Sequence, residues 1–310
     1  MGKSAALFAV AVAAVMWAGS GMAAQHFFAH SDKSALALSN IRMSLAGLLL
    51  LAVAWQSGGL ARGVKVLREK PRLMLDLALY AAIGIFLVQF TYFQGISLGN
   101  AAAATVIEYT CPAVVICWEA LRAWKWPKPG EAAAVVMATV GIFLLVTGGD
   151  TEKLLVPLAC VLWCLLSSVC FAFAAIYPRH LLLEFDPYFL LAVGLLIGGA
   201  GSSFFVETLD WRPFFAPEVV FDIVFIVVCG TALAFVLFNA GLLRLSPEQA
   251  TVTATIEPAA SVLMASLIFG TRFGAAELLG VGLVLVAILT PIFPYRKLKN
   301  SLRRRRRNER

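Results

Sequence analysis

Ten apolar runs follow one another along the chain, and each is about long enough to cross a membrane as a helix. We expect them at about 4–28, 35–55, 73–97, 101–123, 130–148, 154–176, 187–206, 218–242, 247–270 and 274–294. An α-helical span needs roughly 20 apolar residues. The chain is 61% hydrophobic and 14% charged, whereas soluble domains are about 45–50% apolar and about 25% charged. The sequence therefore predicts an all-α integral membrane protein with ten transmembrane helices.

The sequence also repeats itself with a shift of 146 residues and no gap. The matched pairs include Trp17 with Trp163, Asp76 with Asp222, Gly84 with Gly230, Pro112 with Pro258 and Glu131 with Glu277. Two five-helix halves follow, at 1–148 and 149–295. Because five is odd, the second half enters the membrane from the opposite side, so the repeat is inverted. The first apolar run has the composition of a signal peptide, but the repeat requires it as a span.

Positive charge separates the two ends of these spans. With the N-terminus inside, 20 of the 25 Lys and Arg residues lie on the inner side, four lie outside, and Arg42 lies within the membrane. Lys and Arg accumulate in cytoplasmic loops, so we expect a multi-pass protein of the cytoplasmic (inner) membrane with both termini cytoplasmic. Residues 296–310 form a basic cytoplasmic tail, whose expected partner is anionic lipid rather than nucleic acid.

Two acid-and-proline stretches interrupt the apolar runs, one in each half. The first holds Glu108 and Pro112, and the second holds Glu257 and Pro258. Carboxylates inside a membrane usually face the bundle interior or a wet cavity. The prolines match in the repeat, but Glu108 falls on Ala254. The acids therefore break the symmetry of the repeat. We expect residues specific to the substrate at positions where the two halves differ.

Several of these stretches resemble a known family. The matching segments are Trp17-Ala18-Gly19-Ser20, Asn40-Ile41-Arg42, Thr105–Pro112, Leu245-Ser246-Pro247, Ile256-Glu257-Pro258 and Gly274–Gly282. Together with the repeat, they resemble the EamA-type branch of the drug/metabolite transporter superfamily across the whole chain. The resemblance implies a ten-helix carrier for small metabolites, often an exporter, with a central cavity bordered by helices 1, 3, 4, 6, 8 and 9. Glu257-Pro258 is ordinary for that family, whereas Glu108 is less so.

The polar faces of the fourth and ninth helices supply the first candidate site residues. Thr105 shares a face with Glu108, and Thr253 shares a face with Glu257. Arg42 lies about two turns below the outer surface, as Glu108 does. We expect either an Arg42–Glu108 ion pair or an arginine that reaches the outer interface by snorkelling. If Glu108 is unpaired, it becomes a candidate for carrying protons.

The remaining candidates are aromatic and amide side chains within apolar spans. They are Trp17, Trp163, Gln89, Tyr92 and Asn239. The tryptophans lie near mid-span, where they could bind a ligand or pack in the core. Unsatisfied amides in hydrocarbon are unfavourable, so some of these groups should line the cavity. The matched acids Asp76, Asp222, Glu131 and Glu277 lie in first helical turns, and we interpret them as structural.

These observations favour a secondary transporter that works by alternating access, with no enzymatic activity and no cofactor. No GxxxxGK[ST] nucleotide-binding motif occurs in the sequence. The six cysteines and three histidines lack ligand spacing, so we predict no metal site and no structural disulfide. An acid with an arginine favours an amino acid or a derivative as substrate. The family resemblance implies export, and protons are a candidate partner. The alternatives are an uptake carrier for an organic cation or amine, a channel, a non-transporting membrane protein and an intramembrane enzyme.

Overall fold

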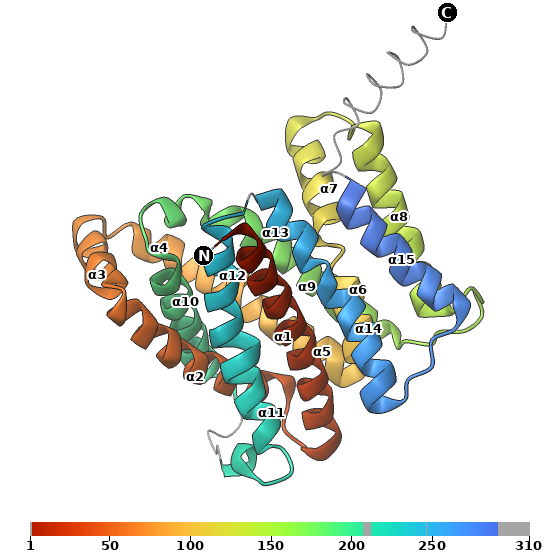
Figure 1. Cartoon of the computed structure of the whole chain (residues 1–310), viewed down its shortest axis with the longest axis horizontal. Helices are drawn as coiled ribbons and strands as arrows, with labels where there is room; N and C mark the ends of the chain where they lie inside the picture. Colours follow the sequence, from red (N-terminus) through yellow and green to blue (C-terminus); the bar gives the residue numbers. More distant parts are fainter. Residues whose placement is uncertain (1, 207–211, 246, 291–310) are drawn as a thin grey trace, which may run out of the picture.

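Within residues 2–206, 212–245 and 247–290, which the computed structural model describes, all regular structure is helical. Figure 1 shows the helices arranged as one bundle. The first five spans are α1 (Lys3–His30), α2 (Ala35–Gln56), α4–η1–α5 (Leu73–Leu79, Tyr80–Leu87, Val88–Leu98), α6–α7 (Ala101–Glu108, Cys111–Ala123) and α8 (Pro129–Thr147). Spans 6 to 10 are α9 (Leu158–Ile176), α10 (Pro187–Ser202), α11–η5–α12 (Val220–Val224, Phe225–Leu233, Ala234–Leu242), α13–α14 (Pro247–Ala254, Ile256–Phe269) and α15 (Ala275–Leu289). Short connecting helices are α3 (Gly59–Glu69), η2 (Tyr177–Arg179), η3 (Leu181–Leu183) and η4 (Arg212–Phe215).

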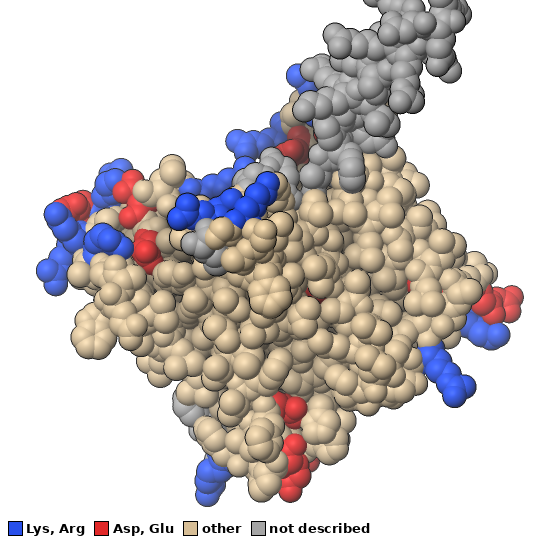
Figure 2. Space-filling model, in the orientation of Figure 1, with Lys and Arg blue, Asp and Glu red and all other residues tan. Residues whose placement is uncertain are grey.

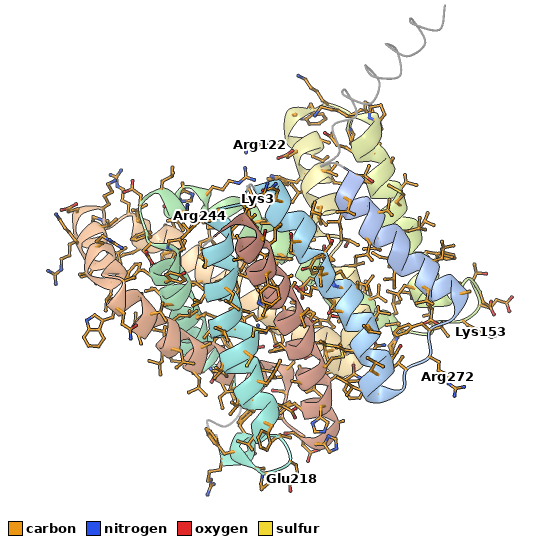
Figure 3. The ribbon with its side chains drawn as sticks, viewed as in Figure 1. Lys3, Arg122, Lys153, Glu218, Arg244 and Arg272 are labelled. Carbon is orange, nitrogen blue, oxygen red and sulfur yellow. The ribbon has the colours of Figure 1, made fainter. Side chains whose placement is uncertain are left out.

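The bundle has the surface of a membrane protein. Eight of the described helical segments are long and apolar enough to cross a bilayer, and two shorter apolar helices, α10 and α15, complete the ten spans. Large apolar side chains such as Leu75, Phe221 and Leu267 are exposed on the outside of the bundle. In the view of Figure 2 charged side chains gather at two opposite ends, with an apolar band between them. Lys3, Arg122 and Arg244 lie at one end, and Lys153 and Arg272 lie at the other (Figure 3).

The packing of the helices shows the inverted repeat directly. Span 2 packs on span 7, and span 5 packs on span 10, so equivalent helices meet each other across the pseudo-two-fold axis. Span 1 packs on spans 8 and 9, and its equivalent, span 6, packs on spans 3 and 4. Each of these contacts thus has a symmetric counterpart or is its own counterpart. The predicted fold, ten transmembrane helices in two inverted five-helix repeats, is confirmed.

Even the irregular parts of the helices occur twice. The π-helical segments η1 and η5 occupy equivalent positions, with Gly84 and Gly230 inside them. Span 4 is interrupted after Glu108 and span 9 after Ala254, again at equivalent positions. In each case the break precedes a matched proline, which cannot donate a backbone hydrogen bond to the residue four positions earlier. These interruptions bring irregular backbone to the middle of the bundle, where ligand sites of transporters are found.

The four matched acids divide into two kinds. Glu131 and Glu277 accept hydrogen bonds from the backbone N–H groups of Lys128 and Gly274, and so cap their own helices. Asp76 and Asp222 instead connect the two halves, which the sequence did not predict. Tyr177 donates to Asp76 at 2.9 Å, joining spans 6 and 3, and His26 pairs with Asp222 at 2.7 Å, joining spans 1 and 8.

Candidate substrate-binding site

A pocket with a volume of about 270 Å³ lies between the two halves. It is lined by Trp17, Ser20, Arg42, Tyr80, Gly84, Ile85, Val88, Gln89, Tyr92, Glu108, Tyr109, Phe171, Ala174, Leu191, Phe235 and Glu257. These residues come from spans 1 to 4 and 6 to 9. Spans 1, 3, 4, 6, 8 and 9 are those implied by the family resemblance, and spans 2 and 7 add Arg42 and Leu191. The volume lies just below the range of about 300–1,000 Å³ common for small-molecule pockets.

The guanidinium of Arg42 is held by the second half of the chain. Its Nε donates to Thr231 Oγ1 at 2.9 Å, and Nη2 donates to the carbonyl of Gly230 at 3.4 Å. Its Cζ lies 5.0 Å from the centre of the Phe93 ring. The whole residue is only 8% exposed, so Arg42 does not snorkel to the outer interface. The expected direct ion pair with Glu108 is not formed, because no carboxylate of the described residues lies within 4.0 Å of this guanidinium.

The carboxyl group of Glu108 contacts a serine of span 6. Glu108 is the last residue of α6, just before the break in span 4, and it is buried. Its Oε1 is hydrogen-bonded to Ser167 Oγ. The same Ser167 oxygen lies 3.1 Å from the carbonyl of Val88, at the end of the π-helical segment η1. The two irregular segments of the first half therefore meet at one hydroxyl from the second half.

Glu257 makes an analogous contact with the other half of the chain. It is buried in the first turn of α14, beside the break in span 9. The hydroxyl of Tyr109 lies 2.7 Å from Glu257 Oε2 and 3.2 Å from the carbonyl of Ala254. Tyr109 itself stands at the break in span 4. The two broken helices are therefore joined through a tyrosine and a glutamate.

Aromatic rings and two unpaired polar atoms complete the pocket wall. Trp17 packs edge-on to Phe235, with ring centroids 5.4 Å apart. The hydroxyl oxygen of Tyr92 is hydrogen-bonded to Thr105 Oγ1 at 2.8 Å. The same hydroxyl lies close to span 1, which is possible because residue 21 is a glycine and has no Cβ to clash with it. Ser20 Oγ and Gln89 Oε1 are buried and have no hydrogen-bond partner among the described residues. Buried polar atoms are normally paired, so a ligand in the pocket could satisfy both.

The structure gathers six of the ten candidate residues at the pocket wall. They are Trp17, Arg42, Gln89, Tyr92, Glu108 and Glu257. Thr105 lies behind the wall, on the hydroxyl of Tyr92. The other three do not line the pocket: Trp163 packs against Phe90, Thr253 bonds to the carbonyl of Gln249 on its own helix, and Asn239 is only partly buried on α12.

Sequence reasoning missed several residues of the site. Tyr109, Ser167 and Thr231 hold the three ionisable groups, and Tyr80, Phe171 and Phe235 form much of the apolar wall. Two of them carried a usable signal. Tyr109 stands within the acid-and-proline stretch, and Phe235 falls on Gln89 in the 146-residue register. Hydroxyl groups of spans that otherwise look apolar gave no such signal.

An inverted pair of five-helix bundles around a central polar pocket is the architecture of a secondary transporter. The sequence model of the EamA-like transporter family matches residues 4–147 and again residues 158–292. The chain therefore belongs to the EamA-like transporter family, within the drug/metabolite transporter superfamily, and is a membrane transport protein rather than an enzyme.

Relatives of similar length support this assignment. The chain is 28% identical over 289 residues to the uncharacterized inner membrane transporter YicL of Salmonella typhimurium, covering 90% of this chain and 92% of YicL. It is 25% identical to the uncharacterized inner membrane transporter YedA of Escherichia coli K12, covering 82% and 80% of the two chains. One solved crystal structure shares the fold, with a TM-score of 0.65 at 19% identity, covering 96% of this chain and 99% of that chain.

Proposed function

We propose that this transporter moves a small zwitterionic metabolite, an amino acid or a derivative of one, by alternating access. The observation that carries the proposal is the combination of groups in one pocket: an arginine with unused donors, two carboxyl groups and aromatic walls. A zwitterion presents one carboxylate and one ammonium, which these groups complement. The pocket volume of about 270 Å³ is just below the range for drug-sized ligands, which suits a molecule as small as an amino acid.

The substrate carboxylate belongs at Arg42. The guanidinium has five N–H donors, and the described residues use only Nε and Nη2. A buried arginine without a carboxylate partner is costly, and its planar fork matches a carboxylate in a bidentate arrangement. Binding the substrate would supply the missing anion. The unpaired oxygens of Ser20 and Gln89 offer further hydrogen bonds beside it.

The substrate ammonium belongs at the two glutamates. In the part of the chain that the structure describes, Glu108 and Glu257 each use one carboxyl oxygen for a hydroxyl neighbour, which leaves the other oxygen for a ligand. Trp17 and Tyr92 lie in the same wall and add aromatic faces that attract a cation. An uptake carrier for an organic cation or amine would use this half of the pocket alone. It would leave the Arg42 guanidinium without a carboxylate partner, so the zwitterion accounts for more of the site.

The relatives and the charge pattern support a membrane location and an orientation for this transporter. The inner membrane is the proposed location because YicL and YedA are named as inner membrane transporters. The excess of basic residues at one end of the bundle supports cytoplasmic termini. Export is the proposed direction, from the family resemblance, and protons are the proposed coupling ion. The basic tail, proposed to contact anionic lipid, lies outside the described residues.

Counterflow in proteoliposomes tests the substrate class. Vesicles loaded with L-leucine or L-phenylalanine are diluted into the labelled amino acid, into the amine that lacks its carboxyl, or into the acid that lacks its amino group. We expect saturable counterflow for the amino acids and at least tenfold slower flux for both truncated forms. Flux of the amines alone would replace the proposal by the organic cation carrier. Flux that does not saturate would indicate a channel.

A further inference from the structure

The two pocket glutamates share a detail of geometry. In each case one hydroxyl oxygen lies between a carboxyl oxygen and a backbone carbonyl. Tyr109 Oη lies between Glu257 Oε2 at 2.7 Å and the carbonyl of Ala254 at 3.2 Å. Ser167 Oγ lies between Glu108 Oε1 and the carbonyl of Val88, which is 3.1 Å away. The two arrangements have the same chemistry although their residues come from different spans.

The number of hydrogens available decides which protonation state fits this geometry. A hydroxyl has one hydrogen to donate, while a carbonyl and an ionised carboxylate can only accept. If the carboxyl is ionised, the hydroxyl faces two acceptors and can fully satisfy only one of them. If the carboxyl is protonated, it donates to the hydroxyl, and the hydroxyl donates to the carbonyl. Both short contacts are then complete hydrogen bonds.

The carbonyl of Ala254 has a particular need for this donor. Residue 258 is proline, so it has no N–H to give to the carbonyl four positions earlier. The hydroxyl of Tyr109 lies against that carbonyl in place of the missing donor. A carbonyl left without a donor in a buried site is destabilising. The hydrogen bond from Tyr109 to the carbonyl of Ala254 therefore favours a protonated Glu257, whose carboxyl group donates a hydrogen bond to Tyr109.

The surroundings offer neither carboxyl a close cation. Arg42 is the cationic side chain in the lining, and it donates to Thr231 and Gly230 instead. No described cation lies within 4.0 Å of either carboxyl group. The other titratable groups around the two carboxyls are Tyr92 of α5, Tyr109 at the break of span 4, Cys111 of α7, and Cys164 and Cys170 of α9.

We propose that Glu108 and Glu257 are neutral carboxylic acids in the substrate-free pocket, and that the ammonium group of a substrate takes the place of one of their protons. The carboxyl O–H bond breaks, the proton leaves to the solution on the side to which the pocket is open, and the carboxylate pairs with the ammonium. One proton and one substrate then occupy the same carboxyl in turn. The transporter is accordingly a proton/substrate exchanger. The exchange step rests on the function proposed above, whereas the protonation of the free pocket does not.

Infrared difference spectroscopy tests the protonation without any substrate. The purified full chain at neutral pH should show the C=O stretching band of protonated carboxyl groups, and Glu108→Gln and Glu257→Gln should each remove part of it. Tyr109→Phe and Ser167→Ala keep both carboxyls but remove the hydroxyl acceptor, so each should move one component to higher frequency. Glu119→Gln is the matched control, because Glu119 is an exposed acid on the same span as Glu108. A band that neither glutamate variant changes would overturn the proposal.

Flux under a pH gradient tests the exchange. In proteoliposomes, an acidic interior should accelerate uptake of L-leucine or L-phenylalanine severalfold, and the gradient effect should be lost in Glu257→Gln, Glu108→Gln or both. Uptake by the wild type that ignores the gradient would refute the exchange. If the infrared band is present but neither amino acid is transported, the proposed substrate class fails and the protonated sites stand.

Discussion

Arg42 shows how a single charged residue is held inside a membrane, where burying a charge is energetically unfavourable. It is buried, and the described residues give its guanidinium two hydrogen bonds but no carboxylate within 4.0 Å. Residues of this kind usually mark substrate pathways. The partners that hold it, Thr231 and the carbonyl of Gly230, lie in the π-helical segment of span 8. The arginine is thus fixed in place by one half of the chain while it projects from the other.

The first prediction is that Arg42→Gln weakens binding of the amino-acid substrate by about ten- to hundredfold. Hydrogen bonds to charged groups contribute about 1.5–3 kcal/mol each, and about 1.4 kcal/mol corresponds to tenfold in affinity. Arg42→Lys should recover little of the loss, because an ammonium cannot make the bidentate contact. The KM for counterflow measures the effect. Unchanged KM in both variants would remove Arg42 from the site.

At the scale of elements, the interruptions of spans 3, 4, 8 and 9 decide where the polar groups meet. A regular helix satisfies its own backbone, whereas these segments leave carbonyls for side chains of the other half. The carbonyl of Ala254 bonds to Tyr109, and that of Gly230 bonds to Arg42. The irregular backbone is therefore part of the pocket and not a packing defect.

The second prediction concerns the matched prolines. Pro258→Ala restores an N–H that can donate to the carbonyl of Ala254, so span 9 should straighten and displace Glu257 from Tyr109. We expect transport to fall at least tenfold while the thermal unfolding midpoint stays the same or rises. Pro129→Ala is the control, because Pro129 is the first residue of α8, where proline is well tolerated. Normal transport by Pro258→Ala would show that the break is dispensable.

The third prediction tests the close packing of spans 5 and 10. A Cβ atom at Gly280 would lie 2.5 Å from the carbonyl oxygen of Gly141, so α15 and α8 would have to move apart. Gly280→Ala should lower the stability by about 1–3 kcal/mol, as overpacking does. A Cβ at Gly282, two residues further on, would meet nothing within 4 Å. Gly282→Ala should therefore leave the unfolding midpoint unchanged or raise it, because alanine is the better helix former. An equal loss of stability in Gly280→Ala and Gly282→Ala would contradict this packing.

At the scale of the whole molecule, the inverted repeat places equivalent contacts at opposite ends of the bundle. Asp76 and Asp222 are matched in the repeat, and each joins its span to the first span of the other half. Asp76 accepts a hydrogen bond from the Tyr177 hydroxyl, and its Oδ2 lies 3.7 Å from His180 Nε2. Asp222 pairs with His26 through its Oδ2. In alternating access, the contact at a given face must open when the pocket opens to that face.

The fourth prediction is that the two aspartates act in opposite directions. With the termini on the cytoplasmic side, as proposed, the Asp222 contact lies at the outer end. Asp222→Asn weakens it, so a cysteine introduced at Ser20 should react faster with an impermeant maleimide applied from outside. Asp76→Asn should accelerate the reaction from the cytoplasmic side instead. Labelling in intact cells and in inside-out vesicles measures both. The same change in both variants would be inconsistent with symmetric contacts at opposite faces.

The fifth prediction fixes the orientation of the bundle. Arg122 and Arg244 lie at one end, and Lys153 and Arg272 lie at the other (Figure 3). If the more basic end is cytoplasmic, Lys153→Cys and Arg272→Cys should be labelled by an impermeant maleimide in intact cells, and Arg122→Cys should not. The wild-type chain gives the background from its own cysteines. The reverse pattern would place the termini outside.

The sequence by itself determined the membrane class, the number of spans and the inverted repeat. Apolar runs of about 20 residues have no stable place outside a bilayer, and an odd number of spans per repeat dictates inversion. Pro112 and Pro258 marked the broken helices, and Glu108, Glu257 and Arg42 stood out because charge in an apolar span is costly. Each of these features is local, or is visible as a periodicity along the chain.

Only the tertiary structure decided which groups meet. Depth along two helices suggested that Arg42 pairs with Glu108, but depth fixes one coordinate and leaves the rotation of each helix open. The actual partners are Thr231 for Arg42, Ser167 for Glu108 and Tyr109 for Glu257. Each of these contacts crosses from one half to the other, over as many as 189 positions in the chain. Apolar spans that carry such hydroxyls look alike in sequence. Which hydroxyl points into the pocket is therefore decided only by the packing of the two halves.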